Sequence, residues 1–132
     1  MTLVVDASVV AKWVLAEDGS DRANALRDEP GLIAPSLLAS EVGNALWKAL
    51  RRGDIARDDA VAALRSVLGP FDELVPSEAL HTRALELAID LRHPIYDCFY
   101  LALAEREAAA LVTADTRLLA VAAKAKMKAR RL

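Results

Sequence analysis

Short apolar runs that alternate with longer helical stretches constrain the fold of this chain more than any other feature. Residues 3–5, 32–34 and 110–113 are continuous apolar runs of the kind found in buried parallel strands. The stretches between them carry apolar residues at helical spacing, for example Leu80 and Leu87, two turns apart. Strands that alternate with helices predict right-handed crossovers. We therefore expect a three-layer α/β/α fold with a central, mostly parallel sheet of four to five strands.

The boundaries of the expected elements follow from turn and capping residues. Ser8 is the expected N-cap of the first helix. The expected helices cover residues 8–15, 20–29, 35–52, 57–68, 77–92, 95–109 and 115–125. Residues 72–75 are expected to form an edge strand, and residues 127–132 either a final strand or a basic tail. Without repeats or linkers, the 132 residues predict a single domain, 1–132.

Composition narrows the function classes only slightly. The formal charge of −2 gives no overall nucleic-acid signature. A single cysteine, Cys98, cannot form an internal disulfide, and with two scattered histidines it does not make a zinc site. We therefore expect a cytoplasmic protein. Asp6 and Lys12 interrupt the apolar N-terminus, which argues against a signal peptide, and no apolar stretch is long enough to span a membrane.

Four carboxylates, Asp6, Glu41, Asp97 and Asp115, lie within otherwise apolar runs. An ionised carboxylate in such surroundings is costly unless a cation or several hydrogen bonds compensate its charge. Asp6 and Asp115 follow predicted strands, at the sheet edge where α/β folds bind ligands. Asp97 falls in the first turn of the helix after Pro94, where the helix dipole favours an ionised carboxylate. Their convergence would make a bound divalent metal the natural compensation.

The oxygen-only character of this set predicts the metal and the reaction. Carboxylates without histidine or cysteine select hard cations, Mg²⁺ or Mn²⁺. One or two such ions can lower the pKa of a bound water and stabilise the leaving oxygen in an in-line displacement. The favoured reaction is therefore phosphodiester hydrolysis.

Four sequence blocks resemble those of PIN-domain nucleases, and most closely the small VapC-type toxins of prokaryotic toxin–antitoxin pairs. The blocks are residues 4–8, 40–44, 96–104 and 112–118. The resemblance implies a Mg²⁺- or Mn²⁺-dependent endoribonuclease in which the four acids form the cluster and Ser8 and Thr113 support it through hydroxyl hydrogen bonds. It also implies an RNA substrate, a homodimer, and a small antitoxin that places a basic side chain in the acidic site.

Two departures from the family pattern are visible. Cys98 stands where alanine is more typical, a small and harmless change. Residues 116–118 supply no further acid after Asp115, so a fifth ligand present in some PIN domains is absent and a second metal site is weakened.

Purely structural explanations stay open for each site residue. Asp6, Asp97 and Asp115 each suit a helix cap, and Glu41 suits a buried salt bridge to Lys48 or an arginine. Asn44, one turn after Glu41 on the same helix face, serves either hydrogen bonding in the site or helix packing.

The basic residues and histidines are less informative. Lys12, Lys48 and Arg117 are candidates for contacts with RNA phosphates, although solvated or salt-bridged side chains are the commoner case. His81 and His93 show no ligand or base spacing and receive no role.

Two rival functions remain. One is a catalytically silent PIN-like module that binds RNA or protein. The other is an unrelated α/β metal-dependent phosphatase with an aspartate nucleophile, but the Asp-x-Asp pattern of such enzymes is broken here by Ser8.

Overall fold

All strands of the central sheet run parallel, in the order β3-β2-β1-β4-β5, in a computed structural model that describes residues 1–132. The strands are β1 (Leu3–Val5), β2 (Leu32–Pro35), β3 (Glu73–Val75), β4 (Ala110–Thr113) and β5 (Ala129–Arg131). The predicted parallel sheet is confirmed. The end of the chain is a strand, because β5 pairs with β4.

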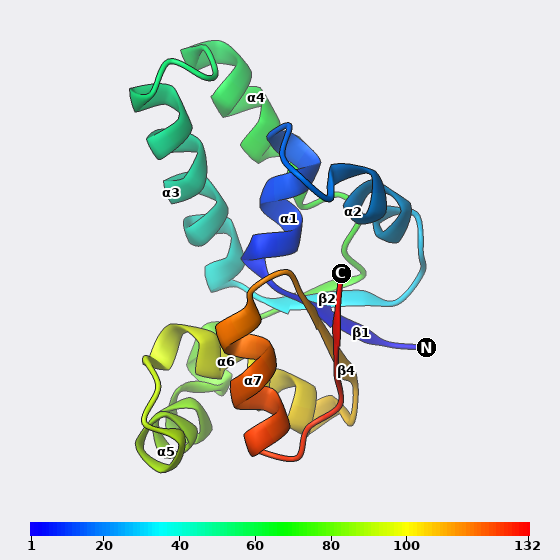
Figure 1. Ribbon diagram of the computed structural model, residues 1–132, viewed down its shortest axis with the longest axis vertical. Helices are drawn as coiled ribbons and strands as arrows, with labels where there is room; N and C mark the ends of the chain where they lie inside the picture. The colour runs from blue at the N-terminus through cyan, green and yellow to red at the C-terminus, as the bar shows by residue number, and fades with distance from the viewer.

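The helices cover both faces of the sheet. They are α1 (Ala7–Val14), α2 (Ser20–Arg27), α3 (Leu37–Arg51), α4 (Arg57–Val67), the 3-10 helix η1 (Ser77–Ala79), α5 (His81–Leu91), α6 (Ile95–Glu107) and α7 (Thr116–Lys124). Figure 1 shows α1 to α4 on one side of the sheet and α5 to α7 on the other. This arrangement confirms the expected three-layer α/β/α fold.

The chain reverses its direction of winding beside β1. It goes from β1 to its neighbour β2 through α1 and α2, and it reaches β4, the neighbour on the other side, only after passing to the opposite face. The carboxyl ends of β1 and β4 therefore flank a topological switch point, the place where open α/β sheets bind ligands. Asp6 follows β1 directly, and Thr113 is the last residue of β4.

The core is built around α6, as its apolar sequence predicts. Residues 98–104 of this helix are all buried, and the helix packs against β1, β2 and β4. A helix that is apolar nearly all round must lie between layers, because no solvent-facing side is left. None of the helices combines the length and hydrophobicity needed to cross a lipid bilayer.

Three expected boundaries were wrong. Asp6, and not Ser8, is the N-cap of α1. Pro35 ends β2 instead of opening the following helix. The helix expected over 77–92 is divided into η1 and α5, because Ser77 is tied to the start of α3: its backbone N–H donates to Ser36 Oγ, and its Oγ accepts from the backbone N–H of Leu37. A tight 3-10 turn accommodates this attachment.

Candidate active site

Asp6 is the most completely enclosed carboxylate of the protein, with 4% of its surface exposed. Its Oδ1 accepts hydrogen bonds from Ser8 Oγ at 2.6 Å and from the backbone N–H of Val9 at 3.3 Å. Its Oδ2 accepts from Thr113 Oγ1 at 2.6 Å. The carboxylate thus caps α1 and is held at the same time by the hydroxyl at the end of β4. These bonds fix its orientation at the switch point.

Glu41 and Asp97 reach the same region from α3 and α6. Glu41 is half-buried, and its Oε1 accepts a 2.6 Å hydrogen bond from the hydroxyl of Tyr100. Asp97 lies in the first turn of α6, and its Oδ2 is 2.6 Å from Nε2 of His93, which is itself buried. Each of these two carboxylates therefore has one dedicated partner that fixes its side chain.

Asp6, Glu41 and Asp97 are close enough for their charges to affect one another's pKa values. Burial raises the pKa of Asp6 to about 6, hydrogen bonds oppose the shift, and the charge of Asp97 adds to it. Burial also raises the pKa of Glu41, and the charges of Asp97 and Asp6 raise it further. No lysine or arginine makes an ion pair with any of the three, so the expected alternative of a Glu41–Lys48 salt bridge is wrong. The only basic side chain paired with any of them is His93, which contacts Asp97, so Asp6 and Glu41 are left without a cation.

Asp115 stands apart from the other three acids. Its Oδ1 caps α7 by accepting from the backbone N–H groups of Arg117 at 2.8 Å and Leu118 at 3.4 Å. Its own N–H donates to Thr113 Oγ1 at 3.0 Å, and the same hydroxyl holds Asp6. The structural explanation of Asp115 as a helix cap is confirmed. Asp115 is linked to Asp6 by hydrogen bonds only through Thr113. The place of Asp115 in the acidic cluster stays a prediction.

A hollow of about 390 Å³ opens beside these acids. Glu41, Asn44 and Lys48 line it from one side of α3, and Tyr96 lines it from the start of α6. This placement puts Asn44 next to Glu41, as predicted, in a position to contact a bound molecule. The remaining lining is apolar or hydroxylated, and it comes from Ala7, Leu37, Ser40 and Ala45.

The other predicted residues fall in different surroundings. Ser8 accepts from the backbone N–H of Ala114 at 2.9 Å and so ties α1 to the loop after β4, in addition to supporting Asp6. Lys12 forms an ion pair with Glu17 at 3.2 Å, and only 15% of its side chain is exposed, which weakens it as an RNA contact. Arg117 is exposed in the first turn of α7 and has no ion pair.

Sequence reasoning missed two residues of this site, His93 and Tyr100. His93 received no role, although it lies four positions before Asp97, a spacing at which side chains can meet. Tyr100 looked like one more apolar core residue of α6. Its hydroxyl was the available signal, since a buried tyrosine hydroxyl normally needs a hydrogen-bond partner.

The site fits a hard divalent cation in its chemistry, but it is not a closed cage. Its donors are carboxylate oxygens with uncompensated charge, which suit Mg²⁺ or Mn²⁺. No three histidine, cysteine, aspartate or glutamate side chains converge closely enough to enclose a metal ion by themselves. Mg²⁺ usually keeps several waters and takes only one or two protein carboxylates together with substrate phosphates. An open arrangement of this kind is therefore compatible with such a metal.

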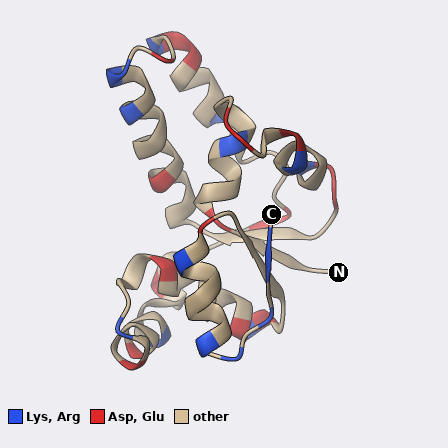
Figure 2. Cartoon of the chain, in the orientation of Figure 1, with Lys and Arg blue, Asp and Glu red and all other residues tan.

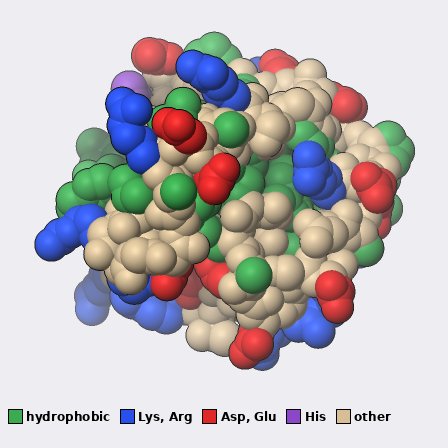
Figure 3. Space-filling view, turned by 90° about the horizontal axis from the view of Figure 1, so that it is seen from above, with side chains coloured by type: hydrophobic (Ala, Val, Ile, Leu, Met, Phe, Trp, Pro, Cys, Tyr) green, Lys and Arg blue, Asp and Glu red, His purple; other side chains and the backbone are tan.

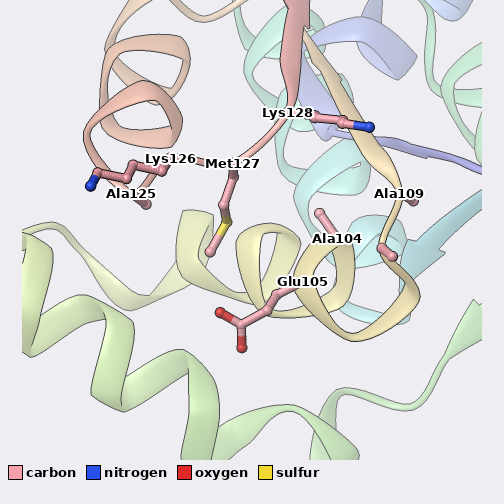
Figure 4. A pocket seen from close by; sticks show the side chains of 8 residues that line it. Ala104, Glu105, Ala109, Ala125, Lys126, Met127 and Lys128 are labelled. Atoms are coloured by element: carbon pink, nitrogen blue, oxygen red, sulfur yellow. The ribbon is translucent and has the colours of Figure 1, made fainter.

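A second hollow, of about 340 Å³, lies at the opposite end of β4. In Figure 4 the side chains of Met127 and Glu105 extend toward one another, while those of Lys126 and Lys128 extend to opposite sides. Glu105 is held by Arg83, whose Nε and Nη2 donate to it at 2.7 and 2.9 Å. Because this hollow is at the amino end of the strand, it is separate from the carboxylate site.

Comparison with known proteins gives a consistent pattern over nearly the whole chain. The family model of the PIN domain matches residues 3–124. The chain is 36% identical over 121 residues to Ribonuclease VapC3 of Pyrobaculum aerophilum, with 89% of this chain and 92% of the relative covered. It is 36% identical over 120 residues to Ribonuclease VapC1 of Mycobacterium tuberculosis, with 89% and 88% covered.

Solved structures support the same fold. The crystal structure of PAE2754 from Pyrobaculum aerophilum matches with a TM-score of 0.70 at 32% identity and covers 92% of this chain and 86% of that one. The structure of FitAcB from Neisseria gonorrhoeae matches with a TM-score of 0.68 at 13% identity, covering 97% and 96%. At that identity the second likeness concerns the fold alone.

Proposed function

This chain belongs to the PIN-domain family, and from that premise we propose that it is a Mg²⁺- or Mn²⁺-dependent endoribonuclease, the toxin of a type II toxin–antitoxin pair. The relatives named ribonucleases match it over almost its full length. The observation that carries the proposal is the enclosed Asp6 at the switch point, close enough to Glu41 and Asp97 for their charges to interact, with no lysine or arginine paired to any of the three. A protein gains nothing in stability from such an arrangement, so a bound cation and substrate are its best explanation.

We propose that Asp6, Glu41 and Asp97 hold the metal between them, one or two directly and the rest through bound water, since no three of these acids converge closely enough to enclose it. Asp115 would join them through Oδ2, the oxygen that does not cap α7. When bound, a divalent cation supplies positive charge that offsets the carboxylates, attracts a phosphate and makes a water molecule more acidic. The coordinating set is completed by water and substrate oxygens, as the open geometry requires.

The side chains around the acids orient them for this task. Thr113 and Ser8 hold Asp6, Tyr100 holds Glu41, and His93 holds Asp97. Hydrogen bonds of this kind keep ligand carboxylates in one geometry and remove the cost of reorganising them during the reaction.

Glu41 is the best-placed acceptor for the proton of the attacking water. It is half-buried and lines the hollow beside the site, and Tyr100 engages only its Oε1. Its Oε2 is therefore the atom to which we assign the proton, which requires that Glu41 hold the metal through this water and not directly. His93 is engaged with Asp97, and Glu41 is the only carboxylate among the residues that line the hollow.

The partners we propose follow from the same site. An antitoxin would inhibit the protein by placing a cationic side chain beside Asp6 and Glu41, whose charge no residue of this chain neutralises. A homodimer is proposed from the family likeness alone. Membership of the PIN-domain family excludes the alternative of an unrelated phosphatase. The alternative of a catalytically silent binding module is decided by the test below.

The test measures cleavage of labelled structured and unstructured RNAs with Mg²⁺, with Mn²⁺ or with a chelator. It compares the wild type, Asp6→Asn, and Asp21→Asn as a control at an exposed aspartate in the first turn of α2. We expect the Asp6→Asn variant to lose about 100-fold in rate or more, the control to keep its activity, and the chelator to abolish cleavage.

A second readout is independent of activity. Mg²⁺ or Mn²⁺ should raise the Tm of the wild type and of Asp21→Asn, and raise that of Asp6→Asn much less, because ligands stabilise the state that binds them. Undiminished cleavage by Asp6→Asn would refute the site assignment. Binding of RNA by the wild type without cleavage of any RNA would instead identify a silent module.

A further inference from the structure

Two hollows lie along α3 and share one lining residue, Lys48. The first, of about 390 Å³, contains Glu41 and Asn44 and belongs to the candidate active site. The other hollow along α3, of about 310 Å³, is lined by three side chains only, and all three are cationic: Lys48, Arg51 and Arg52. The active-site hollow and a wholly basic hollow at the end of the same helix therefore adjoin at Lys48.

The helix sets the distances along this track. Glu41 and Lys48 are seven residues apart, two turns of an α-helix, so both lie on one face. At 1.5 Å per residue, Lys48 lies about 10 Å beyond Glu41 and Arg52 about 16 Å beyond it. With a rise of roughly 3.4 Å per nucleotide in a stacked strand, these distances correspond to about three and about five nucleotides.

The three cations are available to an anion. Lys48 and Arg51 form no ion pair, and the Arg51 guanidinium lies over the ring of Trp47, 5.1 Å from its centroid, which restrains it without neutralising it. Arg52 pairs with Asp54 at 2.9 Å, and both side chains are more than half exposed. Exposed pairs of this kind are weak, so a phosphate can compete for Arg52.

A simpler explanation accounts for part of this cluster. Lys48 and Arg51 occupy the last turn of α3, where cations complement the helix dipole. The same effect is present at the end of α7 with Lys124 alone. The dipole does not require three cations around one hollow, nor that one of them, Lys48, also lines the hollow of the acidic site. Figure 2 shows the resulting separation on α3, red near its beginning and blue toward its end.

An RNA substrate makes a basic track necessary. The acids of the site repel phosphates, and the chain as a whole carries a formal charge of −2. In Figure 3 positive and negative side chains are interspersed over the face seen from above, so that face offers no continuous basic surface. Binding of nucleic acid depends on neutralised phosphates, and the needed cations must therefore be gathered locally, away from the acids.

We propose that Lys48, Arg51 and Arg52 form a phosphate-binding subsite for single-stranded RNA, about three to five nucleotides from the scissile bond on one side. The inference rests on the proposed ribonuclease function and adds to it the path of one flank of the substrate along α3. The contacts are to the backbone, so they raise affinity for every sequence alike.

The test measures RNA binding by fluorescence anisotropy in the Asp6→Asn background, which prevents cleavage. It compares that protein with versions that also carry Lys48→Gln and Arg51→Gln, with a conservative Lys48→Arg, Arg51→Lys pair, and with Lys124→Gln. Lys124 is the matched control, an exposed lysine in the last turn of another helix. The single-stranded RNAs extend to either side of one cleavage position by roughly one to eight nucleotides.

The glutamine pair should weaken binding of the longer RNAs about tenfold or more. It should also lower the slope of log K against log salt by about 0.7 for each lost phosphate contact. RNAs shorter than about three nucleotides on that side should bind equally well to all proteins. The conservative pair should retain most of the affinity, and Lys124→Gln all of it. Near-identical Tm values would show that every variant is folded.

Each other outcome overturns a definite statement. If the Asp6→Asn protein binds RNA and the glutamine pair changes neither affinity nor salt slope, the subsite is wrong while the ribonuclease proposal stands. If the pair weakens only binding of a protein partner, the surface is a protein interface and the subsite is again wrong. If neither wild type nor Asp6→Asn binds any RNA, the proposed function fails and the subsite fails with it.

Discussion

The hydroxyl of Tyr100 donates a 2.6 Å hydrogen bond to Oε1 of Glu41, a residue 59 positions earlier in the chain. Burial, and then the charge of Glu41, hold the pKa of Tyr100 well above its usual value, so the phenol keeps its proton and remains a donor. The bond also opposes the upward shift that burial imposes on the pKa of Glu41. A core residue of α6 therefore controls the orientation and the ionisation of an acid on α3.

Replacement of Tyr100 by phenylalanine should weaken the site without disturbing the core. The ring is kept, but Glu41 loses its donor, its pKa rises further, and its carboxylate becomes free to rotate. We expect a loss of about 1 kcal/mol in the free energy of unfolding, and a rate reduced about tenfold with a higher Mg²⁺ requirement. Tyr96→Phe is the control for stability, because that hydroxyl is exposed and makes no hydrogen bond within the protein, and Asp21→Asn is the control for rate, because Tyr96 lines the hollow beside the site. An unchanged Mg²⁺ dependence of Tyr100→Phe would contradict the role assigned to this bond.

Asp6→Asn should stabilise the protein in the absence of metal. The pKa of Asp6 is raised from 3.8 to about 6 in the folded state, so the folded state binds this proton more tightly than the unfolded state does. The free energy of unfolding must then fall as pH rises through this interval, by up to about 3 kcal/mol, and stay lower above it. The variant avoids this loss, and its advantage should vanish toward about pH 4.

The measurement for Asp6 is urea unfolding with a chelator, from about pH 4 to about pH 8. The raised pKa of Glu41 also makes the free energy of unfolding fall with rising pH, in both proteins. A plot of this free energy against pH should therefore be shallower for the variant than for the wild type, but not flat. If the free energy of unfolding fell equally with pH in the two proteins, ionised Asp6 would not be the group that destabilises the folded state. Stability given up at a functional carboxylate is typical of active sites.

Thr113→Val should damage the site through a single hydroxyl. That hydroxyl donates to Asp6 Oδ2 at 2.6 Å and accepts from the backbone N–H of Asp115 at 3.0 Å, and its side chain is fully buried. Valine has nearly the same shape but leaves both partners unpaired, so we expect a loss of about 1–3 kcal/mol in the free energy of unfolding. RNA cleavage should fall about 10- to 100-fold, as for other groups that orient metal ligands.

Thr113→Ser is the matched control for this change, since serine keeps the hydroxyl and loses only a methyl group. It should retain most of the cleavage rate although it opens a small cavity. Equal loss of rate in the valine and serine variants would show that packing, and not the hydroxyl, is what matters at this position.

The thiol of Cys98 should be inert in the folded protein. It is fully buried, and burial, with the charge of Asp97 beside it, raises its pKa from 9.0 to about 11. Because the thiolate is the reactive form, a chromogenic disulfide reagent at about pH 8 should label Cys98 only after unfolding in urea. Cys98→Ala should keep full RNA cleavage. Rapid labelling of the native protein would show that α6 opens far more readily than its packing indicates.

The sequence by itself determined the layers and the rim of the site. Apolar periodicity specifies strands and helices, and a carboxylate after a buried strand must lie at the carboxyl edge of a parallel sheet. Asp6 could be placed there from local sequence alone, and so could the burial of α6. These features depend on residues a few positions apart, which a linear pattern records.

Only the tertiary structure decided which partner each acid has. Tyr100 meets Glu41 across 59 positions and Thr113 meets Asp6 across 107, distances over which no periodicity carries information. Asp97 and Asp115 are the exceptions, since their partners are local: His93 lies four positions before Asp97, and the N–H that Asp115 caps lies two positions after it. Side-chain hydrogen bonds need atoms within about 3 Å of one another, and that precision arises only when the layers have packed together.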